Sequence, residues 1–153
     1  MTKPAPLELL ADLLARAKAL GADAADALYA EYDALQHGQR LGKIEKLERA
    51  ESRDLGLRVF IGKRQASVSS TELTPAALGA LAERAVAMAR AVPPDEFCGL
   101  AEPTEIAKSV PAIDMFDAEE PSAEALIARA KAAEDAARAV PGVTNSEGGE
   151  ASW

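Results

Sequence analysis

The 153 residues have the size of one ordinary domain, although two incomplete domains fit the same length. Acidic residues outnumber basic ones by 25 to 17, and the formal charge of -8 argues against direct nucleic-acid binding as the main activity. The single cysteine, Cys98, excludes an internal disulfide and fits a reducing compartment. The N-terminus differs from a signal peptide, and no run approaches the ~20 apolar residues of a membrane span. We therefore expect a cytoplasmic protein without a membrane partner.

The first predicted element is an amphipathic helix near the N-terminus. Apolar residues recur there at spacings of three and four, and Gly21 then supplies a C-terminal stop. The stripe consists of Leu9, Leu10, Leu13, Leu14, Ala17 and Leu20.

The next two stretches leave helix and strand both open. Between residues 22 and 42, Leu28, Tyr32 and Leu35 fit a helical stripe, but alternate residues from Leu28 to Ala34 also fit a strand. The alanines of this stretch favour a helix by propensity alone. Residues 41–52 contain Ile44 and Leu47, which are too few to set a period.

A β-hairpin is the clearest sheet signal. Leucine, valine and isoleucine alternate with other residues from Leu55 to Ile61, and Gly62 and Lys63 follow as a two-residue loop. Glycine at the first loop position suits a type II′ turn. The return strand, residues 64–70, is too polar to be buried on both sides, so we predict an antiparallel sheet with one covered face.

Two more helices follow, of which the first is amphipathic. The first begins with Thr74 as N-cap and Pro75, and its stripe consists of Leu78, Leu81, Ala82, Ala85, Met88, Ala89 and Val92. Residues 95–120 contain scattered prolines and are interpreted as an ordered connector or domain boundary. The second helix starts near Pro121 and ends before Pro141. After Gly148 and Gly149 a new element begins, and because Trp153 has few partners there, we expect the chain to be part of a longer protein.

Groups that could carry catalysis are sparse. His37 is the only histidine, so a zinc site built from histidine and cysteine has at most two ligands, where three or four are usual. Neither a hydrolytic triad nor a glycine-rich phosphate loop has a matching motif. We interpret His37, next to Gly38, as an exposed loop or strand-end residue, and Cys98 as a small half-buried apolar residue.

Two charged groups have alternative interpretations. A basic group around the hairpin could bind an anionic partner or a peptide carboxylate, or it could be a solvated face paired with acids such as Glu48 and Glu51. An acidic group before the last helix stabilises the positive end of the helix dipole and lacks the spacing of a calcium loop. The basic residues are Arg53, Arg58, Lys63 and Arg64, and the acidic residues are Asp114, Asp117, Glu119 and Glu120.

Several segments in a fixed order resemble a known family. The stretch from Gly56 to Val92, together with "DEFCGLAEP", "AIDMFD" and "VTNSEGGEASW", is similar to the N-terminal part of PmbA/TldE proteins. These proteins belong to the TldD/TldE family of metalloproteases, also called the modulator of DNA gyrase family. The resemblance implies an α+β fold, with an antiparallel sheet and hairpin covered by amphipathic helices and the truncated start of a second α/β domain. It makes strands of the two ambiguous stretches, Ala27 to Gln36 and Lys43 to Glu51.

The resemblance also implies a domain plan. Residues 1–94 form an N-terminal domain of PmbA/TldD type, residues 95–113 a connector, and residues 114–153 the beginning of a middle domain. TldD and TldE form a cytoplasmic heterodimer that encloses a chamber and cleaves unfolded peptides. Zinc or iron is held by the TldD-type partner, on an H-E-x-x-x-H helix with a later cysteine. No residue of the present sequence matches that motif.

The expected role is therefore that of the N-terminal part of a TldE/PmbA-type subunit, which forms chamber wall and partner interface and holds no cofactor. One alternative is a noncatalytic binding module that uses the basic hairpin, like a gyrase modulator. Another is the N-terminus of a catalytic TldD-like chain. If the polar face of the hairpin lines the chamber, the candidate residues for peptide or partner contact are Arg58, Arg64, Gln65, Ser67 and Ser69.

Overall fold

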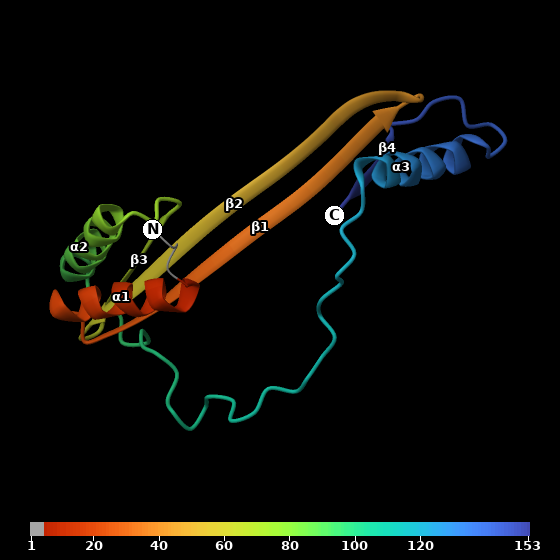
Figure 1. Cartoon of the computed structure of the whole chain (residues 1–153). Coiled ribbons are helices and arrows are strands. Elements are labelled where there is room, and N and C mark those ends of the chain that lie inside the picture. The colour runs from red at the N-terminus through yellow and green to blue at the C-terminus, as the bar shows by residue number, and fades with distance from the viewer. Residues whose placement is uncertain (1–4) are drawn as a thin grey trace. The chain divides into compact units, whose positions relative to one another are not determined.

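The computed structural model describes residues 5–153 and contains three helices and four strands in that part of the chain (Figure 1). The strands have the order β3-β2-β1-β4 in one sheet, in which β1 pairs with β4 and β2 with β3 in antiparallel orientation, so the predicted α+β class is confirmed. The elements are α1 (Pro6–Ala19), β1 (Ala24–Arg40), β2 (Lys43–Ile61), β3 (Arg64–Ser70), α2 (Pro75–Ala91), α3 (Ala123–Arg138) and β4 (Gly149–Ser152).

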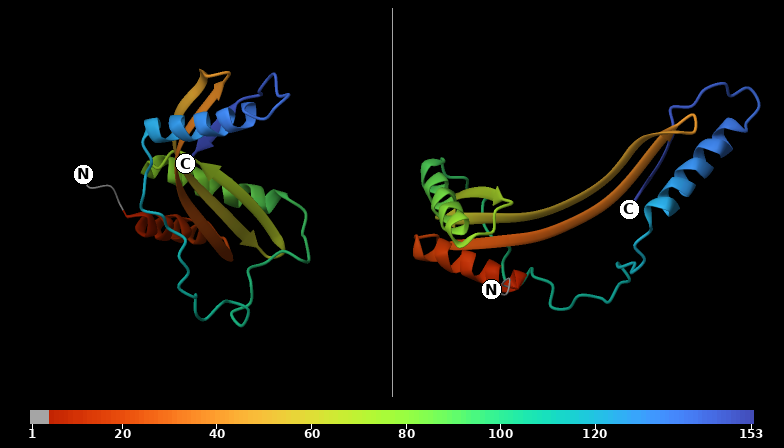
Figure 2. Two further views of the ribbon diagram at one scale, coloured as in Figure 1. Left: turned by 90° about the vertical axis from the view of Figure 1, so that its right-hand side faces the viewer. Right: turned by 45° about the horizontal axis from the view of Figure 1, so that its top comes forward.

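The chain folds into two compact units, each built from two stretches of sequence. The first unit contains the residues up to Glu31 together with Arg53–Val110, and the second contains Tyr32–Ser52 together with Pro111–Trp153. Strands β1 and β2 are neighbours in the sheet and run side by side along their length (Figure 2). Both strands contribute residues to both units. The domain boundaries at residues 94 and 113 stay a prediction.

The core of the first unit lies between the helices α1 and α2 and one face of β2 and β3. Leu55, Leu57 and Val59 are buried there, as the alternation predicted. Many positions on the facing side of α2 are alanines, whose small side chains let helix and sheet approach closely. The predicted stripe is wrong at Met88, which is 43% exposed, because Val86 occupies the buried side of that turn.

The local start and stop signals of the first unit are confirmed. The Thr74 side chain accepts a hydrogen bond from the backbone N–H of Ala77 at 3.3 Å, which is the predicted N-cap of α2. Gly62 has a φ of +55°, and the turn joins Ile61 to Arg64 as the closing pair of the hairpin. A positive φ at the first loop residue is what a type II′ turn requires.

The two ambiguous stretches form strands, as the family resemblance implied. Helix propensity in the alanine-rich stretch is a weak preference, of less than about 1 kcal/mol per residue. Pairing between β1 and β2 gives both backbones hydrogen-bond partners. Oppositely charged side chains on the two strands add to this, since Arg53 pairs with Glu31 at 3.0 Å and Arg49 with Asp33 at 3.4 Å.

In the second unit, α3 packs on β4, and its Glu134 accepts a hydrogen bond from Gln39 near the end of β1. Leu126, Ala130 and Glu134 lie at i, i+4 and i+8 and are the buried residues of α3. Strand β4 pairs with β1 through the register Gln36↔Ser152 to Gln39↔Gly149. A Cβ atom on Gly149 would lie 2.3 Å from the carbonyl oxygen of Ala130, so glycine is required for this close approach.

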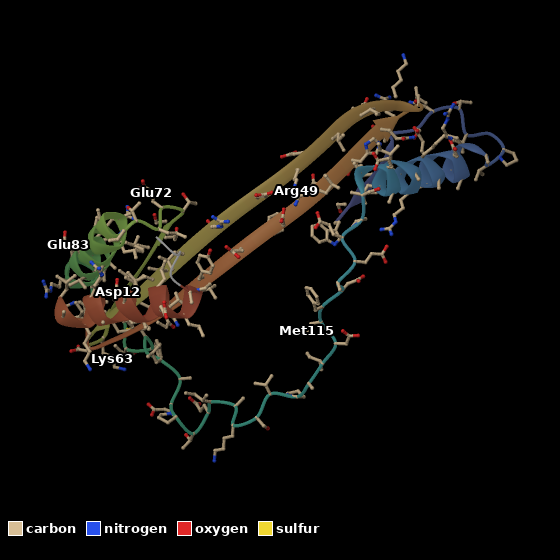
Figure 3. All side chains as sticks on the ribbon, viewed as in Figure 1. Asp12, Arg49, Lys63, Glu72, Glu83 and Met115 are labelled. Atoms are coloured by element: carbon tan, nitrogen blue, oxygen red, sulfur yellow. The ribbon has the colours of Figure 1, made fainter. Side chains whose placement is uncertain are left out.

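The segment between α2 and α3 contains no helix or strand, and its role as a connector or domain boundary stays a prediction. It exposes several large apolar side chains, and Met115 is labelled on it in Figure 3. In the part of the chain that the structure describes, every helix is too short or too polar to cross a membrane.

Candidate binding surfaces

An open depression of about 520 Å³ lies on the face of the first unit's sheet that the side chain of Arg58 occupies. It is lined by Asp26, Ala27 and Leu28 of β1, Gly56, Leu57 and Arg58 of β2, and Ser67, Val68 and Ser69 of β3. We call this depression the sheet trough. A Cβ atom on Gly56 would meet no atom within 4 Å, so the trough is open above this residue. Its polar groups are two hydroxyls and one ion pair.

Two neighbouring side chains, Asp26 and Phe60, hold the guanidinium of Arg58 in position. Its guanidinium donates to both carboxylate oxygens of Asp26, and the Nε–Oδ1 distance is 3.0 Å. The same guanidinium lies 5.1 Å from the ring centroid of Phe60, which is buried beneath it. The hydrogen bonds to Asp26 raise the pKa of Arg58 above its usual value. Arg58 therefore stays charged, but Asp26 offsets its charge locally.

The strand register decides which of the five predicted contact residues lie together. Arg58 pairs with Ser67 and Gly56 with Ser69, so Arg58 and both serines line the trough. Gln65 pairs with Phe60 on the same face but lies outside the lining. Arg64 pairs with Ile61, and by alternation it belongs to the opposite face. The assignment of all five residues to contacts stays a prediction.

The charge partners of the basic group differ from the expected ones. Arg53 pairs with Glu31 and Arg58 with Asp26, both from β1. The acids that the sequence suggested pair elsewhere, Glu48 with Lys46 and Glu51 with Arg49. Charged side chains on neighbouring strands lie opposite each other in the sheet. These partners are far apart in the sequence, so they cannot be identified from nearby residues.

Arg49 forms a second charged cluster in the second unit. Arg49, labelled in Figure 3, contacts Asp33 on β1, Glu51 on its own strand, and Glu120 in the segment before α3 at 2.9 Å. Glu120 thus pairs with a strand residue, and the first turn of α3 carries Glu124 as its acidic residue. The partners are exposed, so this cluster is typical of a solvated face.

The interpretation of His37 as an exposed residue is wrong. It lies within β1, pairs with Ala151 of β4 and is 1% exposed. Gln39, two residues further on, donates to Glu134 of α3, so alternation places His37 on the strand face beneath this helix. Neither ring nitrogen has a hydrogen-bond partner among the described residues.

A metal site does not fit the residues present. Cys98 is free and buried, which agrees with its interpretation as an apolar residue. Within residues 5–153, no three histidine, cysteine, aspartate or glutamate side chains are grouped so that they could hold a metal ion. The metal that a metalloprotease needs therefore has no ligand set in the described residues.

The turn between β1 and β2 is a feature that the sequence analysis missed. Leu41 has a φ of +50° and Gly42 a φ of +75°, which is the type I′ pattern of a two-residue hairpin. Asparagine is preferred at the first position of such a turn, since a leucine there costs about 1–2 kcal/mol. If both flanking stretches are assigned as strands, only Leu41 and Gly42 remain between them, and a two-residue connection predicts this turn.

The carboxylate of Glu134 holds this turn from α3. It accepts hydrogen bonds from the backbone N–H of Leu41 at 2.5 Å, from that of Gly42 at 3.0 Å, and from the amide of Gln39 at 3.0 Å. The Gln39 bond, followed by those of Gly42 and Leu41, lowers the pKa of Glu134 to about 2, although burial opposes the shift. Glu134 is 1% exposed, so the carboxylate is a buried structural anion.

Comparison with known proteins agrees with this fold. Residues 25–89 match the family model described as PmbA/TldA metallopeptidase domain 1. The metalloprotease PmbA of Escherichia coli O157:H7 is 33% identical over 128 residues, and the PmbA homolog of Haemophilus influenzae is 30% identical over 110 residues. These matches cover 83% and 71% of the chain but only 28% and 24% of the relatives.

Two solved structures share the fold at low sequence identity. A protein described as a modulator of DNA gyrase from Bacteroides thetaiotaomicron superimposes with a TM-score of 0.83 at 21% identity, over 99% of this chain and 35% of that one. TldE from Thermococcus kodakarensis gives a TM-score of 0.76 at 17% identity, over 94% of this chain and 32% of that one.

These observations define the class of protein. The fold is that of the N-terminal region of a metallopeptidase-like protein. Residues 25–89 are a first domain of the PmbA/TldD family, and the chain corresponds to about a third or less of the length of the relatives it matches.

Proposed function

We propose that this chain is the N-terminal part of a TldE/PmbA-type subunit in a cytoplasmic TldD/TldE heterodimer that cleaves unfolded peptides. In this proposal the subunit forms chamber wall and partner interface, and the TldD-type partner holds the catalytic zinc or iron. The observation that carries the proposal is the 33% identity to a PmbA metalloprotease over 128 residues. The lack of a metal-ligand cluster in residues 5–153 is compatible with a supporting role.

The sheet trough is the surface that we assign to peptide contact. Its ion pair between Arg58 and Asp26 and the hydroxyls of Ser67 and Ser69 offer both donors and acceptors without a strong net charge. Such a surface can hydrogen-bond to peptide groups and selects little by side-chain charge. That chemistry suits a protease whose substrates are unfolded and varied in sequence.

The binding-module alternative has less support. It requires the basic hairpin to attract an anion, but Asp26 and Glu31 neutralise two of the four basic residues. The overall charge of -8 also repels a polyanion. We therefore favour the subunit role.

The proposal is tested by purifying the full-length protein together with its partners from the native cytosol. We expect a TldD-type chain in a 1:1 ratio, with zinc or iron bound to the complex and not to this subunit alone. Metal on the isolated subunit would indicate a catalytic TldD-like chain. Recovery without a TldD-type chain would contradict the heterodimer.

A matched pair of substitutions tests the trough within that complex. We expect Arg58→Gln to lower kcat/KM for an unfolded peptide by about fivefold, because one charged hydrogen bond to the peptide is lost. Arg64→Gln removes the same charge from the opposite face and should leave kcat/KM within about twofold. If the two substitutions change kcat/KM equally, the sheet trough is not the surface that contacts the peptide.

A further inference from the structure

The tip of the β1–β2 hairpin combines two features that stability does not explain. Leu41 adopts a left-handed backbone conformation in which a leucine is disfavoured, and its side chain is 45% exposed. Asparagine or glycine would make the same turn without this strain. A leucine here strains the backbone of the turn, and its half-exposed side chain gains little packing in return. Strained positions of this kind are found most often at functional sites.

Hydrogen bonds beneath the tip hold the backbone of the turn, and with it the Cα of Leu41, in place. Both N–H groups of the turn donate to the carboxylate of Glu134, and Gln39 holds the same carboxylate. Because Glu134 is buried on α3, the turn is anchored to a helix and not only to its own strands. A knob that is rigid before binding loses little conformational entropy when it docks.

The charge around the tip indicates the kind of surface that it fits. Arg40 and Lys43 flank the turn, and no carboxylate lies in the sequence between His37 and Ile44. Lys43 is exposed, whereas Arg40 donates its Nε to the carbonyl oxygen of Ser146 at 2.9 Å. Ile44, 60% exposed, adds apolar surface next to Lys43. A partner surface complementary to this tip is an apolar pocket with carboxylates at its rim.

We propose that Leu41 is a docking knob that inserts into an apolar, acid-rimmed socket on the TldD-type partner subunit. The inference rests on the proposed function, in which the partner is a TldD-type subunit. It adds that the β1–β2 hairpin tip contacts that subunit. The hairpin tip places the knob, Glu134 holds the backbone of the turn, and Lys43 contributes charge attraction during association.

The test compares stability with affinity, because relieving the backbone strain at Leu41 should not destabilise the subunit but removing its side chain should weaken docking. Leu41→Asn keeps the turn but removes the apolar side chain, so the full-length subunit should show an unchanged or higher urea midpoint. Its affinity for the co-expressed TldD-type protein should fall about tenfold, as expected for the loss of one buried leucine. Leu41→Gly provides a second variant with the same expected pair of results.

Leu7→Gln is the matched control, because Leu7 is an equally large and more exposed leucine on α1. It should leave the dissociation constant within about twofold. Lys43→Glu should slow association and make it less sensitive to salt.

Three outcomes separate the possibilities. Unchanged affinity of both Leu41 variants for the partner would overturn the docking knob and leave the heterodimer intact. Weaker binding of the variants to anionic vesicles with full affinity for the partner would also overturn it, in favour of a lipid surface. Failure of the wild-type subunit to bind a TldD-type protein would contradict the proposed function, and the inference would fall with it.

Discussion

Glu134 is the residue whose role depends most on its surroundings. An acidic residue in an alanine-rich helix is expected on the solvated face. Here it is buried with three donors around its carboxylate, and it satisfies backbone groups of a turn 92 and 93 residues away in the sequence. Buried charges are retained where hydrogen bonds replace the lost hydration, and this site meets that condition.

Glu134 makes the stability of the protein sensitive to acid. Its pKa is about 2 in the folded state, below the 4.5 of the unfolded chain, so the folded state binds the proton less well. The stabilisation is complete above pH ~4.5 and is lost as the pH falls toward 2. We expect Glu134→Gln to lower the urea midpoint at pH 7 by about 1 M, since glutamine offers one acceptor oxygen where the carboxylate offers two.

The pH series distinguishes this effect from general acid unfolding. Between pH 4.5 and 2, the urea midpoint of the wild type should fall more steeply than that of Glu134→Gln. Asp135→Asn, next to it on α3 and exposed with Lys131 as partner, serves as the control and should follow the wild-type slope. Parallel slopes for wild type and Glu134→Gln would contradict the assigned role.

At the scale of elements, the contact between α3 and β4 depends on the absence of a side chain. The run of residues 144–149 that carried part of the family resemblance ends in two glycines. A Cβ atom on Gly148 would lie 2.6 Å from the carbonyl oxygen of Gln39, and its φ is +126°. Gly149 would approach the backbone of α3 even more closely. This part of the resemblance therefore corresponds to a packing requirement.

Gly149→Ala tests that requirement. The new methyl group would overlap the carbonyl oxygen of Ala130, which belongs to the helix backbone and cannot move without displacing α3. We expect a loss of about 1–3 kcal/mol in the free energy of unfolding, measured by urea titration. Gly56→Ala is the control, because its Cβ would enter open space, and it should change stability by less than about 0.5 kcal/mol. Similar costs at the two positions would disprove the packing argument.

At the scale of the whole molecule, the location of the metal is the property that decides between the candidate functions. A ligand that binds only the folded state raises its stability, and removing that ligand lowers it. Among the described residues no cluster can provide a metal site. If the subunit has a supporting role, its stability does not depend on metal.

Metal removal therefore has different expected results for the subunit and for the complex. Treatment of the isolated full-length subunit with EDTA should change its Tm by less than about 1 °C. The same treatment should abolish peptide cleavage by the complex with the TldD-type partner, and zinc or iron should restore it. A large fall in the Tm of the isolated subunit would support the catalytic-chain alternative.

The sequence by itself determined the elements whose signals are local. Helices α1 and α2 follow from their apolar stripes, α3 lies between Pro121 and Pro141 as predicted, and the β2–β3 hairpin follows from alternation around Gly62. Three members of the predicted contact set, Arg58, Ser67 and Ser69, also lie together, because alternation on paired strands fixes which side chains share a face.

Only the tertiary structure decided the features that depend on distant pairing. His37 is buried because β4 and α3 reach it from more than 80 residues away, and the alanine-rich stretch forms β1 because β2 supplies its backbone partners. The strained Leu41 and the buried Glu134 are held by each other, and neither has an unusual sequence environment. Local sequence encodes propensity and periodicity, but burial and charge partners arise from contacts that form only when the chain folds.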